Sequence, residues 1–216
     1  MILRLPETLC LLVLLAMTTA QPVFAMKIIG EARDLSSGEL LYREHHRCED
    51  DGILCSISYV DEGGAVIAKK TMDYSRGDIT PLLQINDYRF ERELVIDAEA
   101  KAGLVVDAGF DNFIRNNWQE LSRNNKVSFN FLIPGRDSPL KMEAHQSKSG
   151  DCESSALCLV VALDNWLLAA ITDPILLTYS RESRRLLRYR GISNLASNDG
   201  KSQEVDILYS YPPVIQ

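Results

Sequence analysis

Hydrophobic and polar residues alternate over most of the chain after residue 26, which is the pattern of strands that bury one face. The alternation is clearest in Gly38–His46 and Ile53–Val60, and short turns separate the consecutive segments. Short connections between alternating segments predict an antiparallel meander, here of roughly nine to eleven strands. The expected strands lie in the region 27–73, with Gly38–His46, Ile53–Val60 and Ala65–Asp73, and at Tyr88–Asp97, Gly103–Val106, Val127–Ile133, Leu140–Gln146, Leu157–Leu163, Ile175–Tyr179, Leu186–Arg190 and Val205–Tyr211.

The hydrophobic period changes from two to between three and four in the middle of the chain, as one face of a helix requires. The apolar residues with this spacing are Phe110, Phe113, Ile114, Trp118 and Leu121. Asp107 or Asp111 is placed to cap the start, because a carboxylate there accepts hydrogen bonds from free backbone N–H groups. We therefore expect one long helix over Asp111–Arg123, and a short one at Asn165–Ile171 that Pro174 ends.

One aromatic helix within a long antiparallel series predicts an α+β fold that is mainly antiparallel β. Because an apolar sheet face must be covered, we expect a strongly curved sheet or incomplete barrel wrapped around the one long helix. Such an arrangement leaves an apolar cavity at its mouth. The candidate lining residues for an apolar ligand are Phe110, Phe113, Ile114, Trp118 and Trp166. The alternative is that these side chains simply fill the core.

The first 25 residues have the order of a secretory signal peptide. Arg4 precedes the apolar run Leu9–Met17, and small residues follow, with cleavage expected after Ala20 or Ala25. Residues 26–216 then form a single curved-sheet domain. No Asn-x-Ser/Thr sequon is present, which slightly favours the bacterial periplasm over a eukaryotic secretory route.

Four cysteines follow the signal segment, and an even number in an exported chain predicts disulfides. The turn signal Asp51-Gly52 centres a hairpin that sets Cys48 opposite Cys55, within reach of a disulfide. Cys152 and Cys158 flank a second short segment in the same way. The alternative is a four-thiolate metal site, but neither pair has Cys-x-x-Cys spacing.

The formal net charge of -7 argues against a nucleic-acid partner, because affinity for a phosphate backbone comes mainly from Lys and Arg. No transmembrane segment is expected after the signal, since Asp164 and Asn165 interrupt the most apolar stretch, Ala156–Ile171. The cations concentrate near the end of the chain. Arg184, Arg188 and Arg190 are candidates for binding anions or an acidic partner, and the alternative is a solvated strand face with cross-strand ion pairs.

Candidate catalytic residues are scarce. His45 and His46 point to opposite faces of a strand, so they do not form a metal pair, and we assign neither metal nor cofactor. His145 is the third histidine, and the chain has no Gly-x-Ser-x-Gly elbow, phosphate-binding glycine loop or dinucleotide fingerprint. We therefore expect no enzymatic activity.

Three stretches resemble uncharacterised exported proteins of Gram-negative bacteria. They are Gly30-Glu31-Ala32 through His45, Ala108-Gly109-Phe110-Asp111-Asn112-Phe113-Ile114 through Trp118, and Leu187-Arg188-Tyr189-Arg190-Gly191-Ile192-Ser193-Asn194 with the closing Val205–Tyr209. This resemblance implies no activity. The leader, the antiparallel sheet and the interposed helix also resemble the periplasmic lipoprotein carriers, which hold acyl chains inside an unclosed barrel.

Three hypotheses follow. The first is a non-enzymatic periplasmic protein that binds a lipid-like or other apolar ligand. The second is an envelope interaction or assembly factor that uses the arginine strand or an open sheet edge. The third is a metal- or water-dependent hydrolase that uses His45, His46 or His145.

Overall fold

A computed structural model describes residues 26–49, 51–98, 103–147, 152–165 and 173–213. Within these residues thirteen strands form one sheet. The strands are β1 (Met26–Asp34), β2 (Leu40–Cys48), β3 (Leu54–Val60), β4 (Val66–Asp73), β5 (Leu82–Asp87), β6 (Arg92–Ile96), β7 (Leu104–Val106), β8 (Val127–Leu132), β9 (Leu140–Gln146), β10 (Ala156–Leu163), β11 (Ile175–Ser180), β12 (Leu186–Ile192) and β13 (Glu204–Ser210).

The strand order is β6-β5-β4-β3-β2-β1-β13-β12-β11-β10-β9-β8-β7, so the sheet is unclosed and ends at β6 and β7. Neighbouring strands are antiparallel, except that β7 pairs with β8 in parallel. The first and last strands, β1 and β13, meet at the middle of the sheet. The predicted antiparallel, incompletely closed sheet is therefore confirmed.

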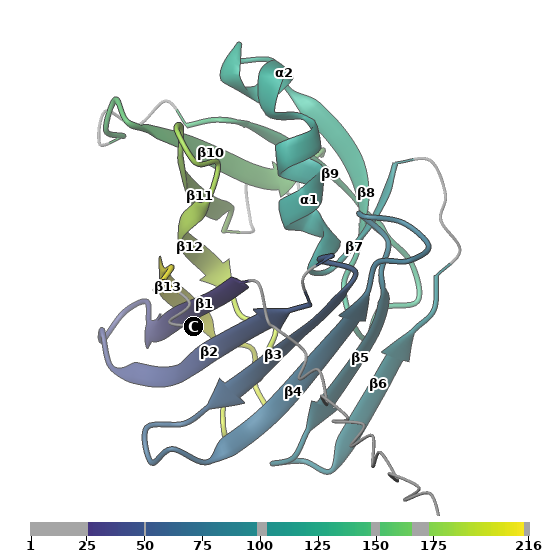
Figure 1. Cartoon of the computed structure of the whole chain (residues 1–216), viewed down its shortest axis with the longest axis vertical. Coiled ribbons are helices and arrows are strands. Elements are labelled where there is room, and N and C mark those ends of the chain that lie inside the picture. The colour runs from purple at the N-terminus through teal and green to yellow at the C-terminus, as the bar shows by residue number, and fades with distance from the viewer. Residues whose placement is uncertain (1–25, 50, 99–102, 148–151, 166–172, 214–216) are drawn as a thin grey trace, which may run out of the picture.

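The prediction of one long helix at the centre of the sheet is wrong. Two short helices, α1 (Gly109–Asn116) and α2 (Trp118–Ser122), stand in place of the expected Asp111–Arg123 helix. Both lie beside β8 and β9, over one half of the sheet, and the described part of the chain has no helix over β1–β6 (Figure 1). The expected helix at Asn165–Ile171 falls almost wholly outside the described residues.

Asn117 explains the break between the helices. Its backbone leaves helical geometry, with φ −99° and ψ 17°. Its side-chain Nδ2 donates a hydrogen bond of 2.9 Å to the carbonyl oxygen of Phe113, where the Asn117 backbone N–H also donates. Short polar side chains that bond to the local backbone compete with a continuing helix. The apolar spacing continues across this break, so periodicity alone could not reveal it.

The strand predicted at Tyr88–Asp97 is too long, and β5 was not predicted. Residues 88–91 instead form the turn between β5 and β6, where Glu91 has a positive φ of 49°. Asp87 ends β5, and its carboxylate accepts bonds from the backbone N–H and guanidinium of Arg89. This local pairing stabilises the turn, although the sequence alternates through it.

The two predicted disulfides, Cys48–Cys55 and Cys152–Cys158, are present. Cys48 and Cys55 lie opposite each other across the β2–β3 hairpin, with 4.1 Å between their Cα atoms. Both disulfides close short loops, which restricts the unfolded chain. None of the described helices combines the length and the apolar character that a bilayer span requires.

The buried apolar residues form two cores along the inner face of the sheet. The first core joins the helices to β8–β11, and its buried members are Val105, Phe113, Ile114, Trp118, Leu121, Phe129, Met142, Ala144, Leu157, Leu159, Val161, Leu177 and Tyr179. The second core belongs mainly to β1–β5 and β13, and its buried members are Ala32, Tyr42, Ile57, Tyr59, Ala68, Met72, Leu83, Ile85, Val106, Leu195, Val205 and Ile207. We call these regions the helix-covered half and the open half.

Candidate functional site

Polar and ionisable side chains gather where the two cores meet, and we call this set the polar seam. Its members are Glu44, His46, Lys70, Asp107, Asp111, Arg115, Asn194 and Tyr209. The position of the seam follows from strand β7, where Val105 belongs to the first core and Val106 to the second. Asp107 comes directly after them and is itself buried. Buried polar groups are costly unless they are paired, so the partners of each group decide what the seam can do.

The first part of the seam is the carboxylate of Glu44, which a tyrosine and a histidine hold. Glu44 on β2 accepts hydrogen bonds at one oxygen from Tyr209 Oη, at 3.2 Å, and from His46 Nε2, at 2.8 Å. The side chain of Glu44 is only 8% exposed, whereas that of His46 is 21% exposed. His46 therefore lies between the buried carboxylate and solvent.

Gly30 makes this arrangement possible. In the sheet register Gly30 on β1 lies between Tyr209 on β13 and Glu44 on β2. A Cβ atom at residue 30 would lie 2.9 Å from a ring carbon of Tyr209. The missing side chain lets the tyrosine ring cross β1 and reach Glu44, which gives a physical role to the first residue of the Gly30-Glu31-Ala32 stretch.

The second part of the seam is a buried ion pair bound to an amide. Lys70 Nζ lies 2.5 Å from Asp107 Oδ2, and both side chains are 2% exposed. Asn194 Nδ2 donates to the other oxygen, Asp107 Oδ1, at 2.8 Å. Asp107 has a positive φ of 38°, a conformation that L residues rarely adopt and that marks local strain. One carboxylate thus joins three segments that are distant in the sequence.

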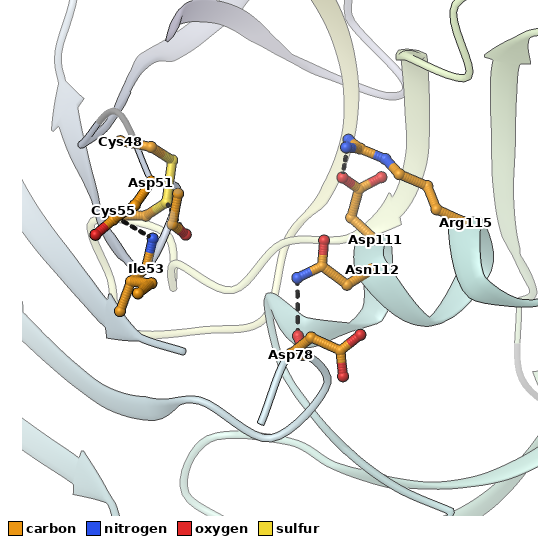
Figure 2. Close-up of a disulfide and its surroundings, with 9 residues drawn as sticks. Cys48, Asp51, Ile53, Cys55, Asp78, Asp111, Asn112 and Arg115 are labelled. Carbon is orange, nitrogen blue, oxygen red and sulfur yellow. Dashed lines mark hydrogen bonds and ion pairs between the residues drawn. A yellow bond between two sulfur atoms is a disulfide. The ribbon is translucent and has the colours of Figure 1, made fainter. Parts of the chain in front are cut away.

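The third part of the seam projects from α1 and is more accessible. The carboxylate of Asp111 pairs with Arg115 one turn later and accepts a hydrogen bond of 3.0 Å from Tyr179 Oη. Figure 2 shows Asp111 and Arg115 turned toward each other, with Asn112 reaching Asp78 on the β4–β5 connection. Desolvation raises the pKa of Asp111, and the positive charges of Arg115 and His46 oppose that rise. Asp111 and Arg115 are 33% and 36% exposed, respectively.

Tyrosines surround these groups. Burial raises the pKa of Tyr42, Tyr59, Tyr179 and Tyr209 well above the ordinary value, and the Glu44 carboxylate raises it further for all except Tyr179. Their hydroxyls therefore stay protonated and are available as donors, as Tyr209 is to Glu44. The inner face between the cores is thus aromatic with polar ends rather than purely apolar.

The candidate lining residues for an apolar ligand lie mostly inside the first core. Phe113, Ile114 and Trp118 are buried, and Phe110 is half-buried against the phenyl rings of β8. Trp166 lies outside the described residues. The described aromatic side chains pack against one another and against the sheet, so they form one cluster.

The candidate arginines are engaged with other side chains. Arg188 pairs with Asp206 through two nitrogens, and Arg190 lies 3.9 Å from the same carboxylate. The guanidinium of Arg184 stands over the Trp118 ring at 5.5 Å. Arg188 and Arg190 lie on the outer face of the sheet, away from the seam, because their register partners alternate with the inward Tyr189.

The strand geometry places the two neighbouring histidines, His45 and His46, on opposite faces of β2. His46 points inward to the seam, and His45 belongs to the opposite face of β2. Burial and nearby cations lower the pKa of His45. Across the described ranges, no three His, Cys, Asp or Glu side chains are grouped so that they could hold a metal ion.

A shallow hollow of about 320 Å³ lies in the open half, near the Cys48–Cys55 hairpin. Its floor is a row of outward side chains across neighbouring strands, Arg47, Ser56, Thr71, Gln84 and Val95. The hollow therefore opens on the side of the sheet away from the polar seam.

Sequence reasoning missed most of the seam. Lys70 follows Lys69 and resembles an exposed pair, yet the strand alternation buries Lys70 and exposes Lys69. The sequence presents Asp107 only as a candidate helix cap, whereas Ala108 is the N-cap of α1 and no side chain caps it.

Comparisons with known proteins supply no family. No protein-family model and no curated protein matches the chain. A search of solved structures finds a domain from Vibrio parahaemolyticus named as a candidate outer membrane lipoprotein-sorting protein. It is 7% identical over 88% of this chain and 86% of that chain, with a TM-score of 0.28. At that TM-score the likeness carries no argument about this protein.

Proposed function

We propose that this chain is a non-enzymatic protein of the bacterial periplasm that binds an amphipathic, lipid-like ligand on the inner face of its open half. The observation that carries the proposal is the uneven cover of the sheet. Helices cover one half of the inner face, while the other half ends at a seam of partly exposed polar groups. Two disulfides support an oxidising compartment such as the periplasm.

The two chemical characters of the inner face match the two ends of an amphipathic molecule. Partly buried apolar side chains border the second core, among them Leu94, Ile96, Leu104 and Leu132. These side chains offer the apolar part of such a ligand a surface that excludes water. His46, Asp111 and Arg115 offer hydrogen bonds and charges to a polar end group. Binding sites of this type are mostly apolar with a few well-placed polar groups.

Lipid extraction and titration test the proposal. The full chain, exported in a bacterial host, is purified without detergent, and its organic extract is analysed by mass spectrometry. A fluorescent fatty-acid probe is then titrated into the protein. We expect co-purifying lipid and saturable binding, with binding weakened several-fold by His46→Leu.

His45→Leu is the matched control, because it changes the neighbouring histidine on the opposite face of the same strand. It should leave binding unchanged. An extract without lipid together with no saturable binding would contradict the proposal. Equal losses of ligand affinity in both histidine variants would mean that the ligand binds at a surface other than the seam.

A further inference from the structure

Three arginines lie within five residues in the turn between β11 and β12, and we call Arg181–Arg185 the arginine turn. All five residues are exposed, and Glu182 is the one carboxylate that the turn itself contains. Among the described residues, no carboxylate lies within ion-pair distance of these three guanidinium groups, whereas Arg188 and Arg190 share the carboxylate of Asp206. A chain with a net charge of -7 therefore presents a positive tip on one hairpin.

Aromatic rings hold two of these guanidinium groups in place. The Cζ atom of Arg184 lies 5.5 Å from the centroid of the Trp118 ring, and that of Arg185 lies 4.7 Å from the centroid of the Tyr211 ring. A ring face attracts a cation without neutralising its charge, and the edge of the guanidinium keeps N–H donors for another acceptor. Both side chains are therefore positioned before any anion binds.

Hydrogen bonds also fix the backbone of the arginine turn. The Arg184 N–H donates to the carbonyl oxygen of Ser180 at 2.9 Å. The Arg181 N–H donates at 2.9 Å to the carbonyl oxygen of Ser155, which lies in the loop that the Cys152–Cys158 disulfide closes. Arg184 has a positive φ of 53°, in the region that favours glycine, and strain of this kind is concentrated at functional positions. A turn that is already ordered loses little entropy when it binds a partner.

We propose that the arginine turn docks this protein on an anionic phospholipid membrane, with its guanidinium groups bound to headgroup phosphates. The planar guanidinium donates two parallel hydrogen bonds to one phosphate, which suits Arg to this anion. Each arginine near an anionic lipid surface adds to the attraction. Because the remainder of the chain carries a net negative charge, attraction at one hairpin also orients the protein on the membrane. The proposal does not depend on the ligand of the inner face, since the turn contains no residue of the polar seam.

The surroundings of the turn favour a membrane over a single anion. The two stacked guanidinium groups stand on rings from separate segments, at the start of α2 and just after β13, so they present their donors at separate points. A lipid surface offers phosphates at many positions and so accommodates separate points. Leu187, which is 38% exposed, lies two residues beyond Arg185. Positive charge together with exposed apolar area is the combination that holds a protein on a lipid surface.

Vesicle sedimentation tests the docking. The protein, purified after export, is mixed at low salt with vesicles of phosphatidylcholine alone, or of phosphatidylcholine and phosphatidylglycerol in equal parts. We expect the protein to sediment with the anionic vesicles only, and added salt should release it because ions screen the attraction. Arg184→Glu/Arg185→Glu should reduce the bound fraction several-fold. Arg181→Glu, which leaves both ring contacts in place, should reduce it by a smaller factor.

Lys69→Glu/Lys141→Glu is the matched control, because it makes the same change of charge at exposed lysines of β4 and β9. This control should still bind the anionic vesicles. Circular dichroism shows whether each variant is folded, and wild type with Arg181→Glu decides the outcome if the double arginine variant is not. An equal loss of binding in the control would overturn the proposal, because net charge alone would then govern binding.

The wild-type protein provides three further outcomes that would overturn the proposal. The first is equal binding to both kinds of vesicle, or binding to neither. The second is release from the anionic vesicles by inorganic phosphate at an ionic strength at which chloride does not release the protein, which would indicate a site for a free anion. The third is tighter binding to polyglutamate than to the anionic vesicles, which would indicate an acidic protein partner.

Discussion

The two halves of this sheet share one backbone scaffold, but they fill their inner faces in different ways. In the helix-covered half, α1 and α2 bring Phe113, Trp118 and Leu121 onto strands whose inward residues are nearly all apolar. In the open half no described helix supplies such cover, and inward tyrosines reach across the sheet to polar partners. Tyrosine suits this place because its ring buries apolar area while its hydroxyl forms a hydrogen bond. The inward polar groups of the open half therefore continue into the seam where the two cores meet.

Each half also contains one short-range disulfide and one glycine that permits a close approach. Cys48–Cys55 closes the β2–β3 hairpin of the open half, and Cys152–Cys158 lies at the start of β10 in the helix-covered half. Gly30 makes room for a tyrosine ring, whereas Gly109 makes room for the backbone of Ile79. These matched features allow the halves to be compared by paired substitutions.

The largest effect is expected from removing the buried cation of the seam. Lys70→Met leaves Asp107 buried with Asn194 as its remaining partner, and the free energy of unfolding should fall by about 3–5 kcal/mol. Lys69→Met, one residue away and exposed, should change it by less than about 0.5 kcal/mol. Urea unfolding followed by tryptophan fluorescence measures both. Equal effects from the two variants would mean that Lys70 is not buried as described.

The disulfides should contribute similar amounts in the two halves. Their loops are of nearly equal length, so the chain-entropy model gives each about 2–3 kcal/mol. The double variants Cys48→Ala/Cys55→Ala and Cys152→Ala/Cys158→Ala should therefore lower the free energy of unfolding by comparable amounts, measured by urea denaturation. If one double variant lost much stability and the other none, the two halves would differ in local stability as well as in the composition of their inner faces.

Substitution of the two glycines by alanine should lower stability by different amounts, because Gly109 faces backbone and Gly30 faces a side chain. A Cβ at residue 109 would lie 2.2 Å from the carbonyl oxygen of Ile79, so Gly109→Ala must displace the β4–β5 connection from α1, at a cost of about 3 kcal/mol. Gly30→Ala needs only a shift of the Tyr209 ring, and about 1 kcal/mol is expected. Thermal unfolding of both variants gives the order. The reverse order would contradict the close contact at Ile79.

The same comparison shows what the sequence could reveal. Strands of the regular meander were predicted within a few residues, and β9 was predicted in full, because an alternating pattern reports directly on a half-buried strand. The pairing of Cys48 with Cys55 followed from one turn signal. Local patterns therefore suffice for local structure.

The remaining features depend on side-chain contacts, local or distant, that leave no mark on the hydrophobic pattern. Asn117 divides the helix through its own side-chain bond to Phe113, and Asp87 closes a turn through Arg89, although the hydrophobic spacing continues through both places. Lys70, Asp107 and Asn194 meet only after three segments of the sheet have assembled. A single sequence holds no periodic trace of such a meeting, so the seam could not be predicted.

The smallest expected effect is the pH dependence of stability that comes from Asp111, at the accessible end of the seam. Because desolvation raises the folded-state pKa of Asp111, the native protein binds more protons at this group than the unfolded chain does. Its contribution to stability is therefore most favourable at low pH. That contribution declines as pH rises from near the ordinary value of 3.8 through the raised folded-state pKa. Partial exposure and the Arg115 pair weaken the effect, so the slope should stay below about 1 kcal/mol per pH unit.

Asp111→Asn isolates this dependence, because the amide keeps an oxygen that can accept from Tyr179 and carries no charge. The free energy of unfolding of each protein is measured from pH 4 to pH 7 at constant ionic strength. Wild type should lose stability relative to the variant as pH rises. If the difference grew in favour of wild type instead, the pair with Arg115 would outweigh burial. Asp111 would then belong to an exposed ion pair, not to the desolvated seam between the two halves.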